Sequence, residues 1–229
     1  MSIARHHAEW ISLVPVSGPF LSLPVLMEAF NTGLEPHDPD QSRLLRQEYG
    51  NWQEAMEKRE SDPAPHQHWI ILVLSKTLEL DDQVLLEGQA IPQTLQTEIP
   101  EHHELLRPSI VVIDPNTKKP RLLVQTYPCS QELTSYVANS RWKVSPDTRM
   151  TELLHATGVR LGLVTNGEQW MLVDAAKGET TGYSSRYAAL WLEKITLQAF
   201  RTLLSASRFF DVPDDQTLEA LLTKSASNQ

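Results

Sequence analysis

The chain has 229 residues, of which 41% are hydrophobic, and a formal net charge of −9 at pH 7. This size provides for one well-developed hydrophobic core, and the acidic balance argues against a surface that binds nucleic acid throughout. The chain has no run of about 18 apolar residues and no apolar segment at its start, so neither a membrane span nor a secretory signal is expected. Its single cysteine, Cys129, excludes an internal disulfide and is expected to be a buried or inert thiol. We therefore predict a cytoplasmic protein.

The first part of the chain is predicted to combine a short strand-like segment with helices. Residues 9–16 alternate apolar and polar side chains, residues 25–30 predict one or two helical turns, and residues 42–59 have the clearest helical spacing. Residues 61–65 then break the pattern with two prolines. We predict three regions: an N-terminal strand and helical extension packed on the core (1–62), a core domain (63–210), and a polar tail or linker (211–229).

A β-hairpin is predicted at the centre of the chain. Residues 110–113 and 122–124 are apolar and largely β-branched, and they flank the turn-rich connector Asp-Pro-Asn-Thr-Lys-Lys-Pro. Asp114 is expected to initiate that turn. Basic residues gather at the connector and farther along the chain, where they could form one rim that contacts DNA. These candidates are Lys118, Lys119, Arg121, Arg141, Lys143 and Arg149.

The second half continues with helices and another hairpin. Residues 130–139 and 147–158 predict helices, and Gly158 is a suitable helix end. Asn166-Gly167 between two apolar runs predicts a hairpin with a type I′ turn. Residues 188–204 predict an amphipathic helix. The histidines lack the second ligand pair of a closed zinc site, so no metal site is expected.

The central hairpin resembles the catalytic hairpin of the PD-(D/E)xK nuclease superfamily. In that superfamily a Pro-Asp precedes the first strand and a Glu-x-Lys closes the second; the carboxylates hold Mg²⁺ and the lysine positions or activates water. Here Pro108 is retained, but Ser109, Gln125 and Tyr127 stand at the positions of the Asp, the Glu and the Lys. The resemblance thus implies a degenerate motif with no catalytic residues and no cofactor. An ordinary hairpin without nuclease ancestry would have the same residues.

A wider resemblance extends over most of residues 10–205. Three passages, at residues 17–26, 107–127 and 157–173, are similar to the N-terminal region of type IIG and type IIL restriction-modification proteins and of the DISARM antiphage methyltransferase. The resemblance implies an α/β fold with a mixed central sheet flanked by helices, that is, a restriction-endonuclease-like core with an N-terminal helical extension. The chain lacks the Gly-rich loop and the Asn-Pro-Pro-aromatic motif of an adenine methyltransferase. Methyl transfer is therefore expected from another part of a longer protein or from a separate polypeptide.

Three functions are compatible with these features. We favour a non-catalytic, nuclease-like module of a bacterial defence system that positions DNA, weakly or within a complex, or docks a methyltransferase or helicase. The alternative is an active Mg²⁺-dependent endonuclease whose acidic residues have migrated to Glu54, Glu57 and Asp114. A third function is a scaffold that binds only protein, which the acidic composition favours over strong DNA binding.

Overall fold

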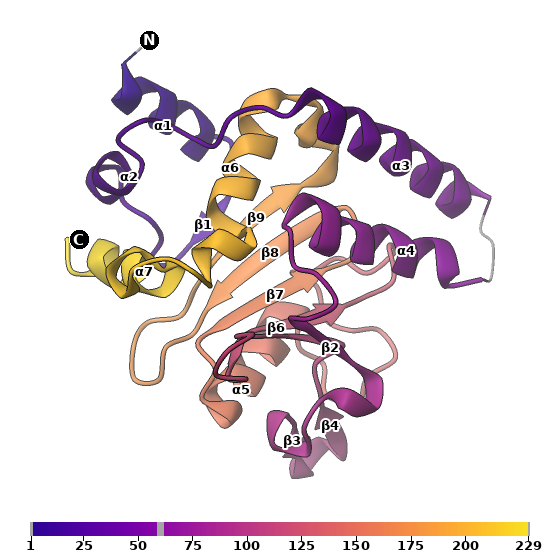
Figure 1. Cartoon of the computed structure of the whole chain (residues 1–229). Coiled ribbons are helices and arrows are strands. Elements are labelled where there is room, and N and C mark those ends of the chain that lie inside the picture. Colours follow the sequence, from indigo (N-terminus) through magenta and orange to yellow (C-terminus); the bar gives the residue numbers. More distant parts are fainter. Residues whose placement is uncertain (1, 59–61, 229) are drawn as a thin grey trace. The chain divides into compact units, whose positions relative to one another are not determined.

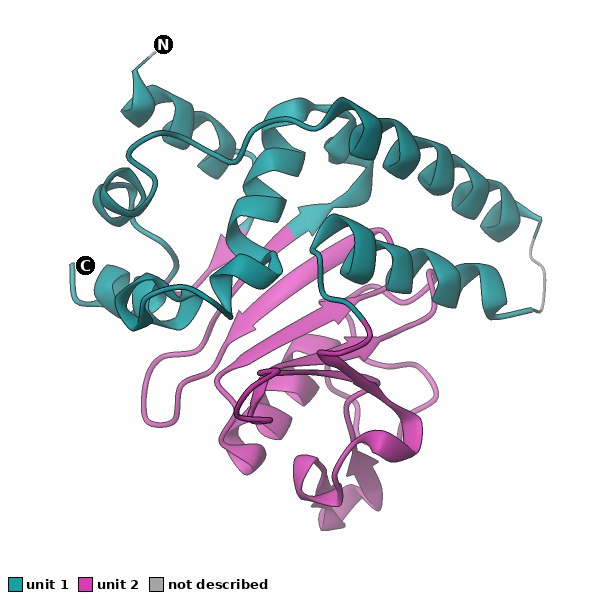
Figure 2. Cartoon of the chain, viewed as in Figure 1, with its two compact units in different colours: residues 1–15, 20–81, 186–229 teal, residues 16–19, 82–185 magenta. Residues whose placement is uncertain are grey.

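The computed structural model describes residues 2–58 and 62–228, and the chain is an α/β protein with a mixed seven-stranded sheet (Figure 1). It divides into two compact units (Figure 2). Unit 1 comprises Met1–Pro15, Phe20–Asp81 and Arg186–Gln229, and unit 2 comprises Val16–Pro19 and Asp82–Ser185. Within the described ranges no helix has both the length and the apolar character that crossing a membrane requires.

Unit 2 contains the large sheet, whose strand order is β1-β9-β8-β7-β6-β5-β2. Neighbouring strands are antiparallel at β2–β5, β5–β6 and β7–β8, but parallel at β6–β7. A second sheet pairs β3 with β4. The strands are β1 (Val16–Ser17), β2 (Leu85–Glu87), β3 (Thr97–Ile99), β4 (Glu104–Leu106), β5 (Ile110–Ile113), β6 (Pro120–Thr126), β7 (Leu161–Thr165), β8 (Gln169–Asp174) and β9 (Gly182–Tyr187), the last of which ends in unit 1.

Helix α5 (Pro146–Thr157) supplies the crossover that the parallel pair β6–β7 requires. It begins with a proline in its first turn and ends at Gly158, whose φ of +75° suits glycine. Its buried residues Met150, Leu153 and Leu154 join the core of the sheet. A Cβ added to Gly162 on β7 would lie 2.5 Å from Met150, so glycine permits the helix to approach the strand closely.

Unit 1 is helical. Aromatic rings hold its helices together: Trp52 stacks on Trp69 with ring centroids 5.9 Å apart, and Trp69 also meets Trp191. The elements are α1 (Ile3–Ile11), α2 (Leu23–Ala29), α3 (Pro39–Glu57), α4 (Ala64–Leu72), a π-helical turn (Val73–Thr77), a 3₁₀ helix (Ala188–Leu192), α6 (Lys194–Leu204) and α7 (Leu218–Ala226).

Several predicted elements are confirmed. The hairpin β5–β6, the helix α5 and the hairpin β7–β8 all lie where the sequence indicates. Gly167 has the positive φ expected in the second turn, but Asn166 does not, so a type I′ turn is wrong. Instead the Asn166 side chain accepts from the backbone of residues 168 and 169. The predicted helix at 42–59 corresponds to α3, which the structure describes as far as Glu57; Arg59 and Ser61 lie outside the described residues.

Two other predicted elements are wrong. Residues 9–11 belong to α1 and not to a strand, because Trp10 is buried and its indole NH donates to His7 Nδ1 in the same helix. Residues 130–139 form turns and no helix, because the Gln131 side chain donates to backbone carbonyls that a helix would use. The predicted division at residue 62 falls inside unit 1, and the predicted tail contains α7 with buried leucines. Cys129, predicted to be a buried or inert thiol, is exposed.

Candidate functional site

The hairpin β5–β6 brings Ser109 and Gln125 together at its open end, which we define as Ser109, Gln125, Thr126 and Tyr127. Gln125 Nε2 donates to Ser109 Oγ at 3.0 Å, and the Thr126 amide and hydroxyl donate to the same oxygen at 3.1 and 3.2 Å. The antiparallel register, with Ile110 opposite Val124, puts both positions at the same end of the two strands. Ser109 and Gln125, the positions that the predicted resemblance aligns with the two nuclease carboxylates, therefore meet in space.

Tyr127 continues β6 and is also part of this site. Its backbone amide donates to the Thr165 carbonyl at 2.8 Å, which extends the parallel pairing with β7. Burial raises the pKa of the Tyr127 hydroxyl above its ordinary value of 10.0, and the charge and hydrogen bond of the Arg149 guanidinium act in the opposite direction without cancelling this effect. Tyr127 is therefore a neutral hydrogen-bonding group at physiological pH.

Arg149 on α5 is held by a polar network that centres on Glu104. The Glu104 carboxylate accepts from the Arg149 guanidinium, the Ser140 hydroxyl and the amides of Arg141 and Trp142. Burial acts to raise the pKa of Glu104, but these hydrogen bonds outweigh it and lower the pKa to about 2. The guanidinium also lies over the Trp142 ring, 5.6 Å from its centroid. The charge of Arg149 is thus compensated by the Glu104 carboxylate.

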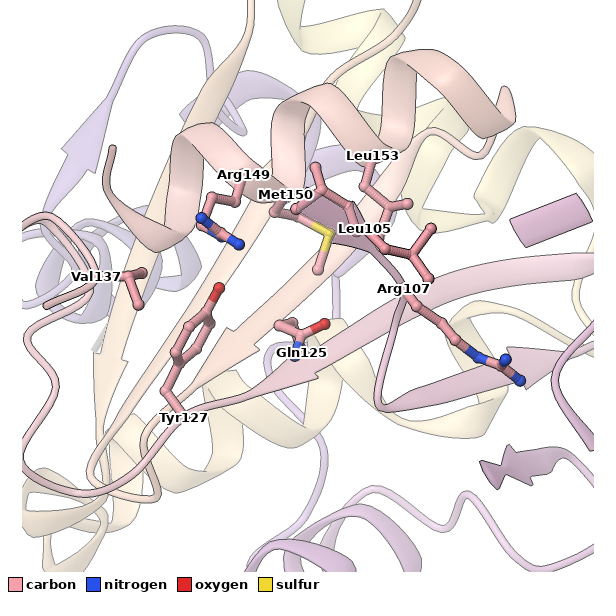
Figure 3. Close-up of a pocket in the computed structure, with 9 residues that line it drawn as sticks. Leu105, Arg107, Gln125, Tyr127, Val137, Arg149, Met150 and Leu153 are labelled. Carbon is pink, nitrogen blue, oxygen red and sulfur yellow. The ribbon is translucent and has the colours of Figure 1, made fainter. Parts of the chain in front are cut away.

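A cavity of about 130 Å³ opens beside these residues (Figure 3). In Figure 3 the Tyr127 hydroxyl points toward Arg149, Gln125 rises from β6 between Tyr127 and Arg107, and the Arg107 guanidinium extends away from the other labelled side chains. Arg107 donates instead to the carbonyls of Gly88 and Ile91 at 2.7 and 2.9 Å. The lining residues are Leu105, Leu106, Arg107, Gln125, Tyr127, Val137, Arg149, Met150 and Leu153.

The donor set at the open end does not fit a Mg²⁺ ion. Such an ion prefers charged carboxylate oxygens, whereas Ser109 and Gln125 offer a hydroxyl and a neutral amide. The Ser109 hydroxyl already takes part in three hydrogen bonds. Within residues 2–58 and 62–228, no three His, Cys, Asp or Glu side chains are grouped so as to hold a metal.

The acidic residues of the nuclease alternative lie elsewhere. Asp114 is at the tip of the hairpin, defined as residues 114–119, where its Oδ1 accepts from the amides of Asn116 and Thr117 at 2.8 Å. These bonds hold the pKa of Asp114 below its ordinary value and confirm that the residue initiates the turn. Glu54 lies on α3 in unit 1, 4.0 Å from Lys58, and Glu57 is the last residue of the same helix.

The six basic candidates form two groups rather than one rim. Lys118, Lys119 and Arg121 lie at or beside the tip, whereas Arg141, Lys143 and Arg149 surround the network of Glu104 near the open end. The seven residues of β6 separate these two ends of the hairpin, which at about 3.3 Å per residue is a separation of roughly 20 Å. Lys118 and Lys119 are exposed, while Arg121 is half-buried.

Glu104, Ser140 and Trp142 are parts of the site that the sequence does not predict. Glu104 stands in a polar stretch of the sequence, 36 residues from Ser140 and 45 from Arg149. Glu104 on β4 meets Arg149 on α5 and Ser140 in the segment before α5 only in the folded chain. The sequence therefore contains no local signal for this network.

Comparison of the chain with protein-family models, with curated proteins and with solved structures gave no match.

Proposed function

We propose that unit 2 is a non-catalytic, nuclease-like module of a bacterial restriction-modification or antiphage defence system, which positions DNA for a methyltransferase or helicase partner. One observation carries the proposal: Ser109 and Gln125, which correspond to the two nuclease carboxylates, lie within hydrogen-bonding distance at the open end of the hairpin. The arrangement of a nuclease acid pair is thus combined with neutral side chains.

The order of elements supports a restriction-endonuclease-like core. A helix precedes the strands β2, β5 and β6, then α5 crosses to β7 in parallel with β6, and β8 and a further helix follow. The succession helix, hairpin, helix, second hairpin and helix is the one expected from the resemblance to the type IIG, type IIL and DISARM proteins.

The charge distribution supports weak contact with DNA at the tip of the hairpin. Lys118 and Lys119 are exposed there, and Arg121 follows at the start of β6. A few phosphate contacts on an acidic protein give a low affinity, which falls further as the salt concentration rises. Such a module would position DNA inside a larger assembly.

The test combines gel retardation with a cleavage assay on the same plasmid DNA, with Mg²⁺ or Mn²⁺. We expect no cutting and weak retention that disappears as the salt concentration rises. The triple variant Lys118→Glu, Lys119→Glu, Arg121→Glu should abolish retention. The matched control reverses three exposed charges on α3 and just after it, Arg43→Glu, Arg46→Glu and Lys58→Glu, and should retain DNA better because it changes the net charge equally but not the tip.

Each other outcome overturns the proposal in a different way. Metal-dependent cutting that is lost in Asp114→Ala or Glu54→Ala would make the protein a nuclease. If both triple variants lose retention equally, the loss is caused by the change in net charge and not by the tip of the hairpin. Absence of both cutting and retention would indicate a scaffold that binds only protein.

A further inference from the structure

The size of the cavity at the open end restricts what it can hold. Its volume is about 130 Å³, whereas drug-sized ligands occupy pockets of roughly 300–1,000 Å³. A cavity of ~150 Å³ holds a single benzene molecule. The cavity therefore matches one six-membered ring.

The charges around the cavity argue against a free anion as the ligand. The Arg149 guanidinium is paired with the Glu104 carboxylate, and the Arg107 guanidinium is bound to backbone carbonyls and extends away (Figure 3). A neutral ring with a polar edge is a better match, because the apolar side chains of Leu106, Met150 and Leu153 line the cavity together with polar groups.

Two of the polar groups that line the cavity lie along one strand. Gln125 and Tyr127 both belong to or directly follow β6, two residues apart, so they project from the same face. Gln125 Nε2 donates one of its two hydrogens to Ser109 Oγ, which leaves the other hydrogen and the carbonyl oxygen of this amide, and the neutral Tyr127 hydroxyl can also donate and accept. A pyrimidine base complements this lining, because its faces are apolar and its edge carries hydrogen-bonding groups that proteins recognise with polar side chains.

The loop beside the cavity carries groups that suit a single DNA strand. Val137 lines the cavity, and the adjacent Tyr136 is 60% exposed, with the Lys143 ammonium 5.4 Å from its ring centroid. Arg141 is exposed on the same loop. Exposed aromatic rings next to cations bind single strands by stacking on bases and neutralising phosphates.

We propose that the cavity receives one unpaired pyrimidine base of DNA, whose edge hydrogen-bonds to Gln125 and Tyr127. Tyr136 stacks on the neighbouring base, and Arg141 and Lys143 contact the flanking phosphates. The inference rests on the proposed DNA-positioning function and specifies which form of DNA this end of the hairpin takes.

The test measures binding of the full chain to fluorescent oligothymidylate, oligodeoxyadenylate, a perfect duplex and a duplex with one unpaired thymine. Oligothymidylate should bind about tenfold more tightly than the perfect duplex or oligodeoxyadenylate, since a stacked base contributes that order of affinity. The bulged duplex separates the two sources of an unpaired base: tighter binding than the perfect duplex means that an extruded base is accepted as well as a free strand.

Two variants, with one matched control, test whether the base binds in the cavity. Leu105 lines the cavity and is 52% exposed, so Leu105→Trp should fill the entrance without disturbing the core and should remove the preference for oligothymidylate. Leu190→Trp, at an exposed leucine in unit 1, is the matched control and should leave the preference intact. Gln125→Met keeps the length of the side chain but removes its polar edge, and it should weaken oligothymidylate binding severalfold.

Equal binding of all four DNAs, or a preference for oligothymidylate that survives Leu105→Trp, would overturn the inference. Retention of duplex DNA through the tip would persist in those outcomes, so the proposed function would stand. If none of the four DNAs binds, the proposed function fails and the inference fails with it. The two failures are therefore distinguishable.

Discussion

The two ends of the hairpin β5–β6 are built in different ways. At the tip, the Asp114 side chain accepts from Asn116 and Thr117, its carbonyl accepts from the Lys118 amide at 2.9 Å, and its amide donates to the Lys119 carbonyl at 2.8 Å. Every one of these bonds joins residues within a six-residue stretch. The tip is therefore specified by its own sequence.

The open end depends on segments that are distant in the chain. Ser109 is bonded to Gln125 and Thr126 across the hairpin, and the neighbouring network joins Glu104 to Ser140 and Arg149. Such contacts form only when the core of unit 2 is in place. We therefore expect substitutions at the open end to report on the whole unit and substitutions at the tip to remain local.

The largest effect is expected from Arg149→Met. The variant leaves the Glu104 carboxylate, whose side chain is only 15% exposed, without its cationic partner. Removing one partner of a buried pair should lower the free energy of unfolding by about 3–4 kcal/mol. Urea denaturation measures the loss.

The matched control is Arg43→Met on α3. Arg43 pairs with Asp40 at 3.3 Å, but both side chains are exposed, at 77% and 89%. Such a surface pair contributes less than about 1 kcal/mol. Similar losses in the two variants would show that Glu104 and Arg149 are screened by solvent, and the contrast between the ends would weaken.

The next largest effect is expected from acid, which should destabilise the protein through Glu104 at the open end. The pKa of Glu104 in the folded protein is about 2, below the ordinary value of 4.5. The carboxylate therefore stabilises the fold fully above about pH 4.5, and this contribution is lost as the pH falls toward 2, amounting to about 2–3 kcal/mol. Unfolding free energies of the natural protein and of Glu104→Gln, measured across this range, should converge as the pH falls.

The comparison with Glu104→Gln is needed because other carboxylates respond to acid in the same direction. Backbone hydrogen bonds also lower the pKa values of Asp38 and Asp114. These groups titrate in both proteins, so the difference between them isolates Glu104. A constant difference from pH 7 to pH 2 would contradict the low pKa.

The same contrast explains what could be predicted from the sequence. Short apolar runs and turn residues predict three features from the local sequence alone: the strands of the hairpin, the turn at Asp114 and the end of α5 at Gly158. The positions Ser109 and Gln125 were found through the resemblance, and their contact follows from the strand register.

What the sequence could not show depends on long-range packing. The two residues of the Glu104–Arg149 pair are 45 positions apart in the chain. Residues 130–139 form turns instead of the predicted helix, and the Asn166 side chain stabilises these turns by donating to the Gln131 carbonyl. The same applies to α1, where burial of Trp10 outweighs an alternating pattern. In each case tertiary contacts decide the local structure.

An intermediate effect is expected from Ser109→Ala. The change removes the oxygen that accepts from Gln125, from the Thr126 amide and from the Thr126 hydroxyl. Loss of a shared acceptor in a half-buried position should cost about 1–2 kcal/mol. Ser12→Ala is the control, because the exposed Ser12 hydroxyl donates only to the Glu9 carbonyl; an equal cost for both would show that the cluster at Ser109 adds nothing.

The smallest effect, and one of opposite sign, is expected from Lys118→Gly at the tip. Lys118 has a φ of +58°, in the left-handed region that costs a residue with a Cβ about 1 kcal/mol. Glycine relieves this strain but has more freedom in the unfolded chain, so a net gain of about 0.5 kcal/mol is expected in urea denaturation. Lys119→Gly, next to it and without a positive φ, should instead lose a similar amount. Because the tip is specified locally, the NMR signals of Tyr127 should not move in either variant, and a shift there would show that the two ends of the hairpin are coupled.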